Sequence, residues 1–153
     1  ETISHLINGL LTSKKADKLI LCTTTLKEDD ILCEIAESKG INFFRGSVTD
    51  KLERGRGACK KFNVDFFVTA DGDDLFYDHR LSDMCFEQIE DNDLVDGQGL
   101  YNDVYGFKSK TIENIINISR GDVVEPHEIV SFLQDRNFKI HKCTWNTISS
   151  FTN

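Results

Sequence analysis

Four carboxylates follow an apolar run near the middle of the sequence. The run Phe-Phe-Val at 66–68 has the composition of a buried strand, and Asp71, Asp73, Asp74 and Asp78 come soon after it. Like charges this close repel, so water or a cation must relieve them. Mg²⁺ usually takes one or two carboxylates together with substrate phosphates, and short aspartates at a strand end suit it. Asp and Gly also favour an ordinary turn, so the residues alone leave both readings open.

Short apolar runs alternate with segments of helical spacing in the first half of the chain. The runs expected to form strands are 18–23, 41–44 and 64–70, and the helical segments are 2–11, 25–40 and 50–62. This alternation is typical of βαβ units, a parallel sheet with helices on both faces. Ligands gather at the carboxyl ends of the strands in such sheets, which is where the four aspartates fall.

Helix starts and stops refine these expectations. Thr25 with Glu28, and Asp50 with Glu53, have the spacing of capping boxes. Gly55 and Gly57 lie inside the helix expected over 50–62. Glycine lowers helix propensity, so we expect that helix to be weak, bent or late to start. Further along, helices are expected to begin near 78, 109 and 126, and strands at 93–97, 103–107 and 138–145.

Composition narrows the class of protein. The chain has 153 residues, 39% hydrophobic and 29% charged, which fits one domain with a real core. Its formal charge of −8 and scattered cations argue against a nucleic-acid partner. No apolar run is long enough to span a membrane. Five cysteines without a C-x-x-C pair favour neither a disulfide framework nor a zinc site, and they make the cytoplasm the simplest location.

The segment 41–78 resembles the central part of cytidylyltransferases of the spore-coat polysaccharide and CMP-sugar synthetase type. The resemblance rests on Arg-Gly-Ser at 45–47, on Asp-x-Leu-x-Arg at 50–54, and on the acidic turn Thr-Ala-Asp-Gly-Asp at 69–73, in this order. It implies a three-layer α/β/α, Rossmann-like nucleotidyltransferase fold, also called the nucleotide-diphospho-sugar transferase fold, with a mostly parallel sheet. It also implies a reaction of CTP with an acidic or other sugar that gives a CMP-sugar and pyrophosphate.

The same resemblance implies roles for individual residues. Asp71 matches the family's metal-binding aspartate and is the expected catalytic residue, and Asp73 beside it is the second candidate ligand for Mg²⁺, with Mn²⁺ as the alternative ion. The residues expected to contact CTP or the sugar are Arg45, Ser47, Asp50, Arg54 and Asp103. The arginine fork suits oxyanions, although each arginine is equally suited to a surface pair with Asp50 or Glu53.

The family's glycine-rich triphosphate loop and a late acidic motif have no counterpart in residues 1–153. We therefore expect a single nucleotidyltransferase domain over 1–153 that lacks the N-terminal phosphate-binding loop and the C-terminal end. Such a piece is expected to be inactive by itself.

Two other readings stay open. Asp71-x-Asp73 is also the D-x-D pattern of glycosyltransferases of the related fold, which bind a metal and a nucleotide-diphosphate sugar. A non-catalytic domain that retains the fold is the second, favoured by Tyr105 where the family usually has an acid. Whether two copies form a homodimer is open as well.

Overall fold

The computed structural model describes residues 2–74, 76–97, 104–119, 122–125 and 128–143. The strands are β1 (Ile20–Thr24), β2 (Asn42–Gly46), β3 (Phe66–Val68), β4 (Leu94–Asp96), β5 (Tyr105–Lys108) and β6 (Ile140–Lys142). The helices are α1 (Thr2–Leu10), a 3₁₀ turn η1 (Lys27–Asp29), α2 (Asp30–Ser38), α3 (Lys51–Phe62), α4 (His79–Ile89), α5 (Ser109–Ser119) and α6 (Ile129–Gln134). Each of these strands and helices except η1 falls on a segment where the sequence predicted that type.

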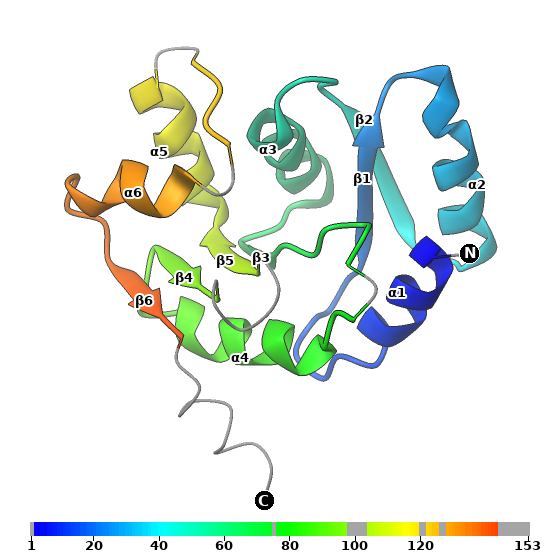
Figure 1. Cartoon of the computed structure of the whole chain (residues 1–153), viewed down its shortest axis with the longest axis horizontal. Helices are drawn as coiled ribbons and strands as arrows, with labels where there is room; N and C mark the ends of the chain where they lie inside the picture. The colour runs from blue at the N-terminus through cyan, green and yellow to red at the C-terminus, as the bar shows by residue number, and fades with distance from the viewer. Residues whose placement is uncertain (1, 75, 98–103, 120–121, 126–127, 144–153) are drawn as a thin grey trace, which may run out of the picture.

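The first sheet is a parallel pair. β1 and β2 run side by side from Ile20 opposite Asn42 to Thr24 opposite Gly46. Figure 1 shows α2 on one side of this pair and α3 on the other, and both helices contact both strands. This is the βαβ unit that the alternation predicted, because two parallel strands require a crossover and the helix between them supplies it.

The second sheet has four strands in the order β3-β5-β4-β6 and is mixed. β4 and β6 are parallel, whereas β5 is antiparallel to both β3 and β4. The expectation of a mostly parallel sheet is therefore not met by the described ladders. Residues 97–104, which connect β4 to β5, are fewer than the dozen or so that a parallel crossover needs, so β5 has to return antiparallel.

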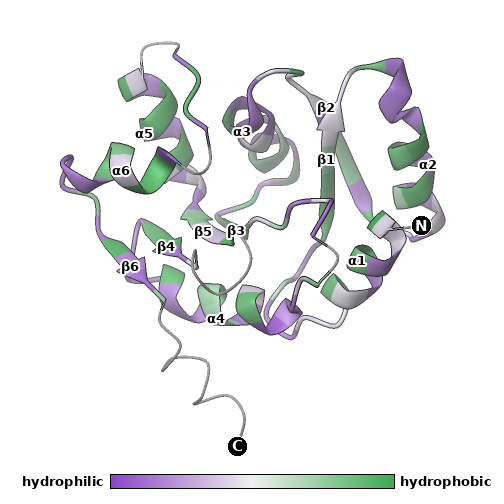
Figure 2. Cartoon of the chain, viewed as in Figure 1, coloured by the Kyte–Doolittle hydropathy of each residue, from purple (hydrophilic) through white to green (hydrophobic). Residues whose placement is uncertain are grey.

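The second sheet is buried on both faces. α4 contacts β3, β4 and β5 on one face, while α5 contacts β5 and lies with α6 on the other (Figure 1). Side chains alternate along β4, so Leu94 joins the cluster under α5 and α6 and Val95 joins the cluster over α4. Phe107, 1% exposed, stacks on Phe67 with ring centroids 5.2 Å apart. Full burial of such a side chain stabilises the fold by about 1.5–3 kcal/mol. Figure 2 shows hydrophobic segments, in green, on the strands of this sheet and on the helices that cover it.

Helix α3 begins at Lys51 and is continuous to Phe62, so the expectation of a late start is wrong. A methyl group at Gly57 would lie 2.5 Å from Phe44 Cζ, so glycine is what lets the β2 ring pack against the helix. Gly55 meets nothing closer than Ile112 Cδ1 at 3.9 Å. Packing against β2 therefore offsets the low helix propensity of Gly57.

Aspartates cap two of the helices near the starts that the sequence predicted. Asp50 accepts a hydrogen bond from the Glu53 amide at 2.9 Å and caps α3, and Asp78 accepts one from the Arg80 amide at 2.9 Å and caps α4. The predicted Thr25–Glu28 box is wrong, because a 3₁₀ turn precedes α2 and the helix begins only at Asp30. Asp103 and Pro126 lie outside the described residues.

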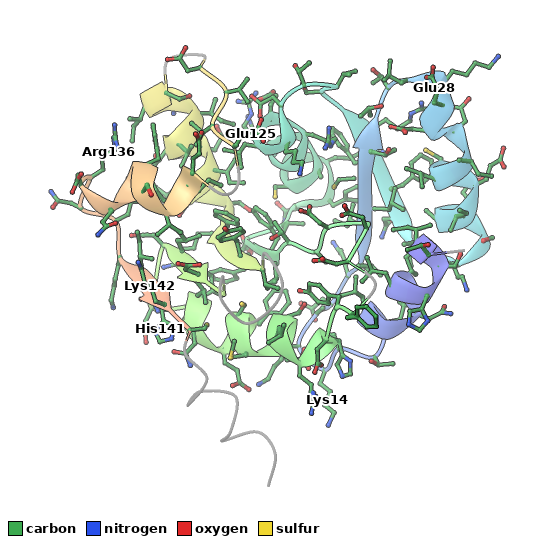
Figure 3. All side chains as sticks on the ribbon, viewed as in Figure 1. Lys14, Glu28, Glu125, Arg136, His141 and Lys142 are labelled. Carbon is green, nitrogen blue, oxygen red and sulfur yellow. The ribbon has the colours of Figure 1, made fainter. Side chains whose placement is uncertain are left out.

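Asp83 ties the segment after α1 to α4. Its carboxylate accepts hydrogen bonds from the Ser13 hydroxyl at 2.5 Å, the Lys14 amide at 3.1 Å and the Lys15 amide at 3.1 Å. Figure 3 places Lys14 beside α4. Burial by itself raises the pKa of Asp83, but the hydrogen bonds from Ser13, Lys14 and Lys15 outweigh it and lower the pKa. The carboxylate therefore contributes to stability in its ionised form.

Membrane insertion has no support in the helices. Within the part of the chain that the structure describes, no helix combines the length and the apolar composition needed to cross a bilayer.

The two glycines of α3 provide a matched pair of stability predictions. Gly57→Ala should destabilise the protein by about 1–3 kcal/mol, because the new methyl group overlaps the Phe44 ring. Gly55→Ala should stabilise it by about 0.5–1 kcal/mol, because the site is open and alanine favours the helix. Urea denaturation followed by circular dichroism measures both. Equal effects of the two substitutions would contradict the packing argument.

The Asp83 anchor predicts a pH dependence. Since the folded-state pKa is lowered, the stabilisation is present above the unfolded pKa of about 3.9 and disappears as the pH falls through the folded value. Asp83→Ala should cost about 2 kcal/mol at pH 7, because the charged hydrogen bonds are lost. The difference in urea midpoint between wild type and Asp83→Ala should shrink on acidification, whereas Asp91→Ala at an exposed position serves as a control. A pH-independent difference would contradict this role for the carboxylate.

Candidate functional site

A lysine that follows β2 lies close to an aspartate that follows β3. Lys51, the first residue of α3, follows β2, and Asp71 follows β3. Lys51 Nζ lies 3.8 Å from Asp71 Oδ2, although the two residues belong to different strand–helix units. The segments that follow β2 and β3 therefore come together although the two strands belong to different sheets, and we call this place the candidate edge. Ligands bind beyond the carboxyl ends of strands in open α/β folds.

Asp71 and Asp73 lie in the turn that follows β3. The Asp71 side chain is 47% exposed, and its carbonyl accepts a hydrogen bond from the Asp74 amide at 3.1 Å. Asp73 is exposed. A Cβ atom at Gly72 would contact Ile3 Cδ1 at 3.4 Å, so α1 lies against the same turn. The turn that one reading of the sequence expected does form, and it leaves the Asp71 carboxylate accessible. The metal site of the other reading stays a prediction.

A tyrosine hydroxyl closes the loop that carries Asp71. Tyr77 donates to the Thr69 carbonyl, with the oxygens 3.2 Å apart, and its hydroxyl also lies 2.7 Å from the Ser82 hydroxyl. Thr69 is in turn held to β5, because its amide donates to the Tyr105 carbonyl at 2.8 Å. Burial raises the pKa of the Tyr77 phenol, which keeps it protonated and able to donate. The start and the end of the acidic loop are thereby joined.

Asp78 has a structural task. Besides capping α4, it accepts hydrogen bonds from the Arg80 guanidinium, with Arg80 Nε 2.9 Å from Asp78 Oδ2. The Arg80 side chain lowers the pKa of Asp78 through this hydrogen bond. Its charge is therefore balanced within α4, unlike that of Asp71, whose cationic neighbour comes from another helix.

Arg45 fastens the loop after β1. Its Nε donates to the Thr24 carbonyl at 2.9 Å, and one terminal nitrogen donates to the Leu26 carbonyl at 2.6 Å. The other terminal nitrogen pairs with Asp30 Oδ1 at 2.5 Å. The arginine fork therefore binds the β1–α2 connection, and the suggested pairing with Asp50 or Glu53 is replaced by one with Asp30.

Ser47, Asp50 and Arg54 build the start of α3. The Ser47 hydroxyl accepts from the Asp50 amide at 3.1 Å, and Arg54 donates back to the Ser47 carbonyl at 2.6 Å. Gly46 permits this closure, because a Cβ atom there would lie 3.1 Å from Arg54 Cγ and 2.7 Å from Phe44 Cε1. The motif that carried the family resemblance thus fixes the first turn of α3 against β2.

A second polar cluster lies beyond β1. Asp29 accepts hydrogen bonds from the hydroxyl groups of Thr23 and Thr24 and from the Thr24 amide. The Thr24 hydroxyl is the largest cause that lowers the pKa of Asp29. This carboxylate holds the β1–η1 connection in place.

The carboxylates of the acidic loop suit a metal ion that takes its remaining ligands from water and a bound phosphate. Among residues 2–74, 76–97, 104–119, 122–125 and 128–143, no three His, Cys, Asp or Glu side chains group closely enough to hold a metal ion by themselves. Asp71 presents an accessible carboxylate that a cation, the Lys51 ammonium, already approaches. Mg²⁺ usually takes one or two carboxylates and completes its shell with water and phosphate oxygens, so the donors present fit that ion.

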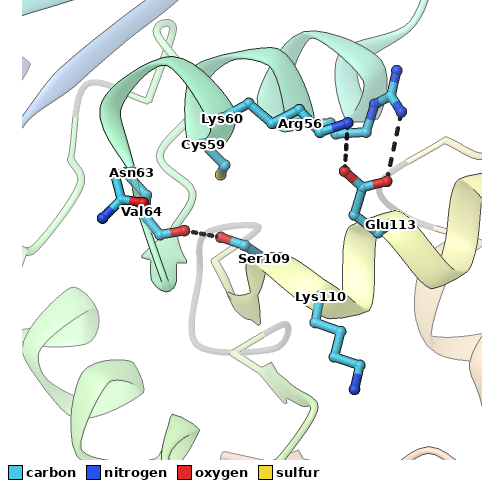
Figure 4. A pocket seen from close by; sticks show the side chains of 8 residues that line it. All are labelled: Arg56, Cys59, Lys60, Asn63, Val64, Ser109, Lys110 and Glu113. Atoms are coloured by element: carbon cyan, nitrogen blue, oxygen red, sulfur yellow. Dashed lines mark hydrogen bonds and ion pairs between the residues drawn. The ribbon is translucent and has the colours of Figure 1, made fainter.

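A cavity of about 350 Å³ lies elsewhere, between α3 and the start of α5 (Figure 4). Two of its cations share one carboxylate: Lys60 Nζ is 2.8 Å from Glu113 Oε1, and Arg56 is 3.5 Å from the other oxygen of Glu113. Ser109 at the start of α5 donates its hydroxyl to the Val64 carbonyl. These contacts hold α3 to α5, and Asp71 does not line this cavity.

Sequence reasoning missed two residues of the edge. Lys51 has no motif of its own, but its position directly after the capping residue Asp50 places it at a helix start beside the strand ends. Tyr77 reads as an apolar residue in a loop, and only the fold brings its hydroxyl to Thr69.

Comparison of the sequence with known proteins gives a partial match. No protein-family model matches the chain. An uncharacterized protein of Methanocaldococcus jannaschii is 37% identical over 89 residues, which is 58% of this chain and 37% of that relative. The chain thus spans well under half of that relative's length.

Solved structures match almost the whole chain. A cytidylyltransferase from Leptospira borgpetersenii superposes with a TM-score of 0.77 at 24% identity, over 93% of this chain and 64% of that one. A 4-diphosphocytidyl-2C-methyl-D-erythritol synthase from Anaerococcus prevotii gives 0.68 at 19% identity, over 94% and 76%. A CMP:2-keto-3-deoxy-manno-octonic acid synthetase complexed with CTP gives 0.67 at 11% identity, over 93% and 78%. The chain therefore has the α/β nucleotidyltransferase fold that these three proteins share, as the resemblance in the sequence predicted.

Proposed function

We propose that the protein containing this chain is a cytidylyltransferase that activates an acidic or other sugar with CTP. A sugar oxygen attacks the α-phosphorus, a new P–O bond forms, and the bond from the α-phosphorus to the bridging oxygen breaks. Pyrophosphate leaves with that oxygen, and the sugar oxygen loses its proton to solvent or to a basic group. The products are a CMP-sugar and pyrophosphate.

The observation that carries this proposal is the placement of Asp71. In a fold shared with cytidylyltransferases, its half-exposed carboxylate lies at the carboxyl end of β3 with a cationic side chain 3.8 Å away. A turn that served the backbone alone would not require an accessible carboxylate next to a lysine from another helix. The CTP complex of one structural neighbour supports the choice of nucleotide.

The residues of this chain would act mainly by positioning. Mg²⁺, when bound, would neutralise charge on the phosphates, with Asp71 and Asp73 as its protein ligands. Tyr77 keeps the loop that bears Asp71 closed on Thr69. Proximity and orientation of this kind supply a large share of catalysis in such transfers.

The predicted substrate-binding residues take two kinds of role in this proposal. Ser47, Asp50 and Arg54 set the start of α3, and Arg45 sets the loop after β1, so all four shape the edge at which CTP would bind. Direct contact of these side chains with CTP stays a prediction. Asp103, proposed to contact the acceptor sugar, lies outside the described residues.

We also propose the domain organisation and the cellular location that the sequence predicted. The chain would form one nucleotidyltransferase domain and would need a triphosphate-binding loop from elsewhere in the protein for turnover. Free cysteines at all five positions fit a reducing compartment, for which we propose the cytoplasm.

Asp71→Asn is the direct test. In protein expressed from the complete reading frame, with CTP, Mg²⁺ and eight- or nine-carbon acidic sugars, release of pyrophosphate should fall by about 100-fold or more, because the ligand charge is lost. Stability should change by no more than about 0.5 kcal/mol, since the side chain is half exposed. Pyrophosphate release and urea denaturation measure the two effects.

Asp91→Asn, at an exposed position on the far end of α4, is the matched control and should leave turnover unchanged. Full activity of Asp71→Asn would mean that the acidic loop is only a turn. Turnover of UDP-sugars with Mn²⁺, in place of CTP, would identify a glycosyltransferase of the related fold. If wild type released no pyrophosphate with any of these substrates, a non-catalytic domain would be favoured.

Wild-type protein should also bind CTP measurably. Saturating CTP with Mg²⁺, at about 100 times its dissociation constant, should stabilise the native state by about 2.7 kcal/mol. A thermal-shift assay of CTP, ATP, GTP and UTP with and without Mg²⁺ measures this. A larger shift with another nucleotide would contradict the assignment of CTP.

A further inference from the structure

Lys51 is the cationic residue that shares the candidate edge with Asp71. Its ammonium group lies 3.8 Å from the Asp71 carboxylate, and the two side chains are 51% and 47% exposed. The contact joins the first turn of α3 to the loop after β3. Neither residue is needed at that place to complete its own helix or strand, since Asp50 caps α3 and the Asp71 carbonyl, not its side chain, closes the turn.

The backbone of Lys51 is held by hydrogen bonds of the helix start, while its side chain is 51% exposed. The Asp50 carboxylate accepts from the Glu53 amide, and the Arg54 amide donates to the Asp50 carbonyl at 3.1 Å, so the first turn of α3 is closed on both sides of Lys51. The Arg54 side chain adds a bond to the Ser47 carbonyl. A flexible four-carbon stem on a fixed helix start can move its charge by several ångströms without a change in the fold.

Asp71 and Asp78 differ in the cations that balance their charges. Asp78 pairs with Arg80 of its own helix through a fork of short bonds. Asp71 instead meets a single ammonium group at the outer limit of an ion pair. An exposed pair of this kind contributes little to stability, so a divalent cation can displace the lysine readily.

We propose that Lys51 is an exchangeable counter-ion of Asp71. Without ligand its ammonium group neutralises the carboxylate. When a divalent cation binds Asp71, the ammonium is released and turns to the phosphates of the nucleoside triphosphate that accompanies the metal. The phosphate half of this inference rests on the proposed function, whereas the exchange with a cation at Asp71 does not.

The experiment compares Lys51→Met and Lys51→Arg with wild type in the complete protein. Lys27→Met, at an exposed position of η1, is the matched control. Mn²⁺ alone, measured by the EPR signal of the free ion, should bind about threefold tighter to Lys51→Met, because Asp71 has lost its competing cation. CTP with Mg²⁺, measured by calorimetry, should bind about tenfold or more weakly to the same variant, because a phosphate contact is lost.

Opposite effects on the two ligands are the signature that a purely structural ion pair would not give. Lys51→Arg should keep CTP affinity near the wild-type value, and Lys27→Met should change neither affinity. Adding Asp71→Asn to Lys51→Met should abolish the gain in Mn²⁺ affinity. Circular dichroism of each variant confirms that the fold is retained.

Each outcome decides a part of the inference. Unchanged or weaker Mn²⁺ binding in Lys51→Met would overturn the counter-ion role. Normal CTP affinity in Lys51→Met, while wild type binds CTP, would overturn the phosphate contact and leave the proposed function standing. If wild type binds no CTP, the proposed function fails together with the phosphate contact, and the Mn²⁺ result alone then supports or overturns the exchange.

Discussion

The close approach of α3 to β2 is the constraint on which the candidate site depends. The Phe44 ring occupies the space that side chains at Gly46 and Gly57 would fill, so both glycines are needed for strand and helix to meet. Arg54 closes the junction by donating to the Ser47 carbonyl. A helix fixed this tightly presents its first turn to the edge where β3 ends. A shift of α3 would carry Lys51 away from the acidic loop, because Lys51 is the first residue of the helix.

The residues that carry the family resemblance also form the contacts that fix the start of α3 and the loop after β1. Arg-Gly-Ser at 45–47 and Asp-x-Leu-x-Arg at 50–54 resemble substrate-binding motifs, yet their donors and acceptors bond to one another and to neighbouring backbone. Unsatisfied polar groups are costly to bury, so a motif that shapes an edge has to satisfy itself first. Shaping the site and contacting the ligand are compatible tasks for an arginine with five donors.

The larger sheet supports the acidic loop from behind. Thr69 bonds to Tyr105 of β5, and Tyr77 bonds back to Thr69, so the loop is attached to the best-buried strands of the molecule. Phe107 and Phe67 stack beneath it. Rigid strands that end in a short, tethered loop hold a charged group with little freedom, which is how electrostatic preorganisation is achieved.

Local signals in the sequence determined the helices and strands and placed a carboxylate directly after a strand. Periodicity placed the strands and helices to within a few residues, Asp50 and Asp78 marked two helix starts, and the position of Asp71 after an apolar run indicated a strand-end carboxylate. The tertiary structure decided what depends on distant contacts: the antiparallel return of β5, the continuity of α3 through Gly57, and the meeting of Lys51 with Asp71. These follow from packing between segments far apart in the chain, which periodicity and spacing do not encode.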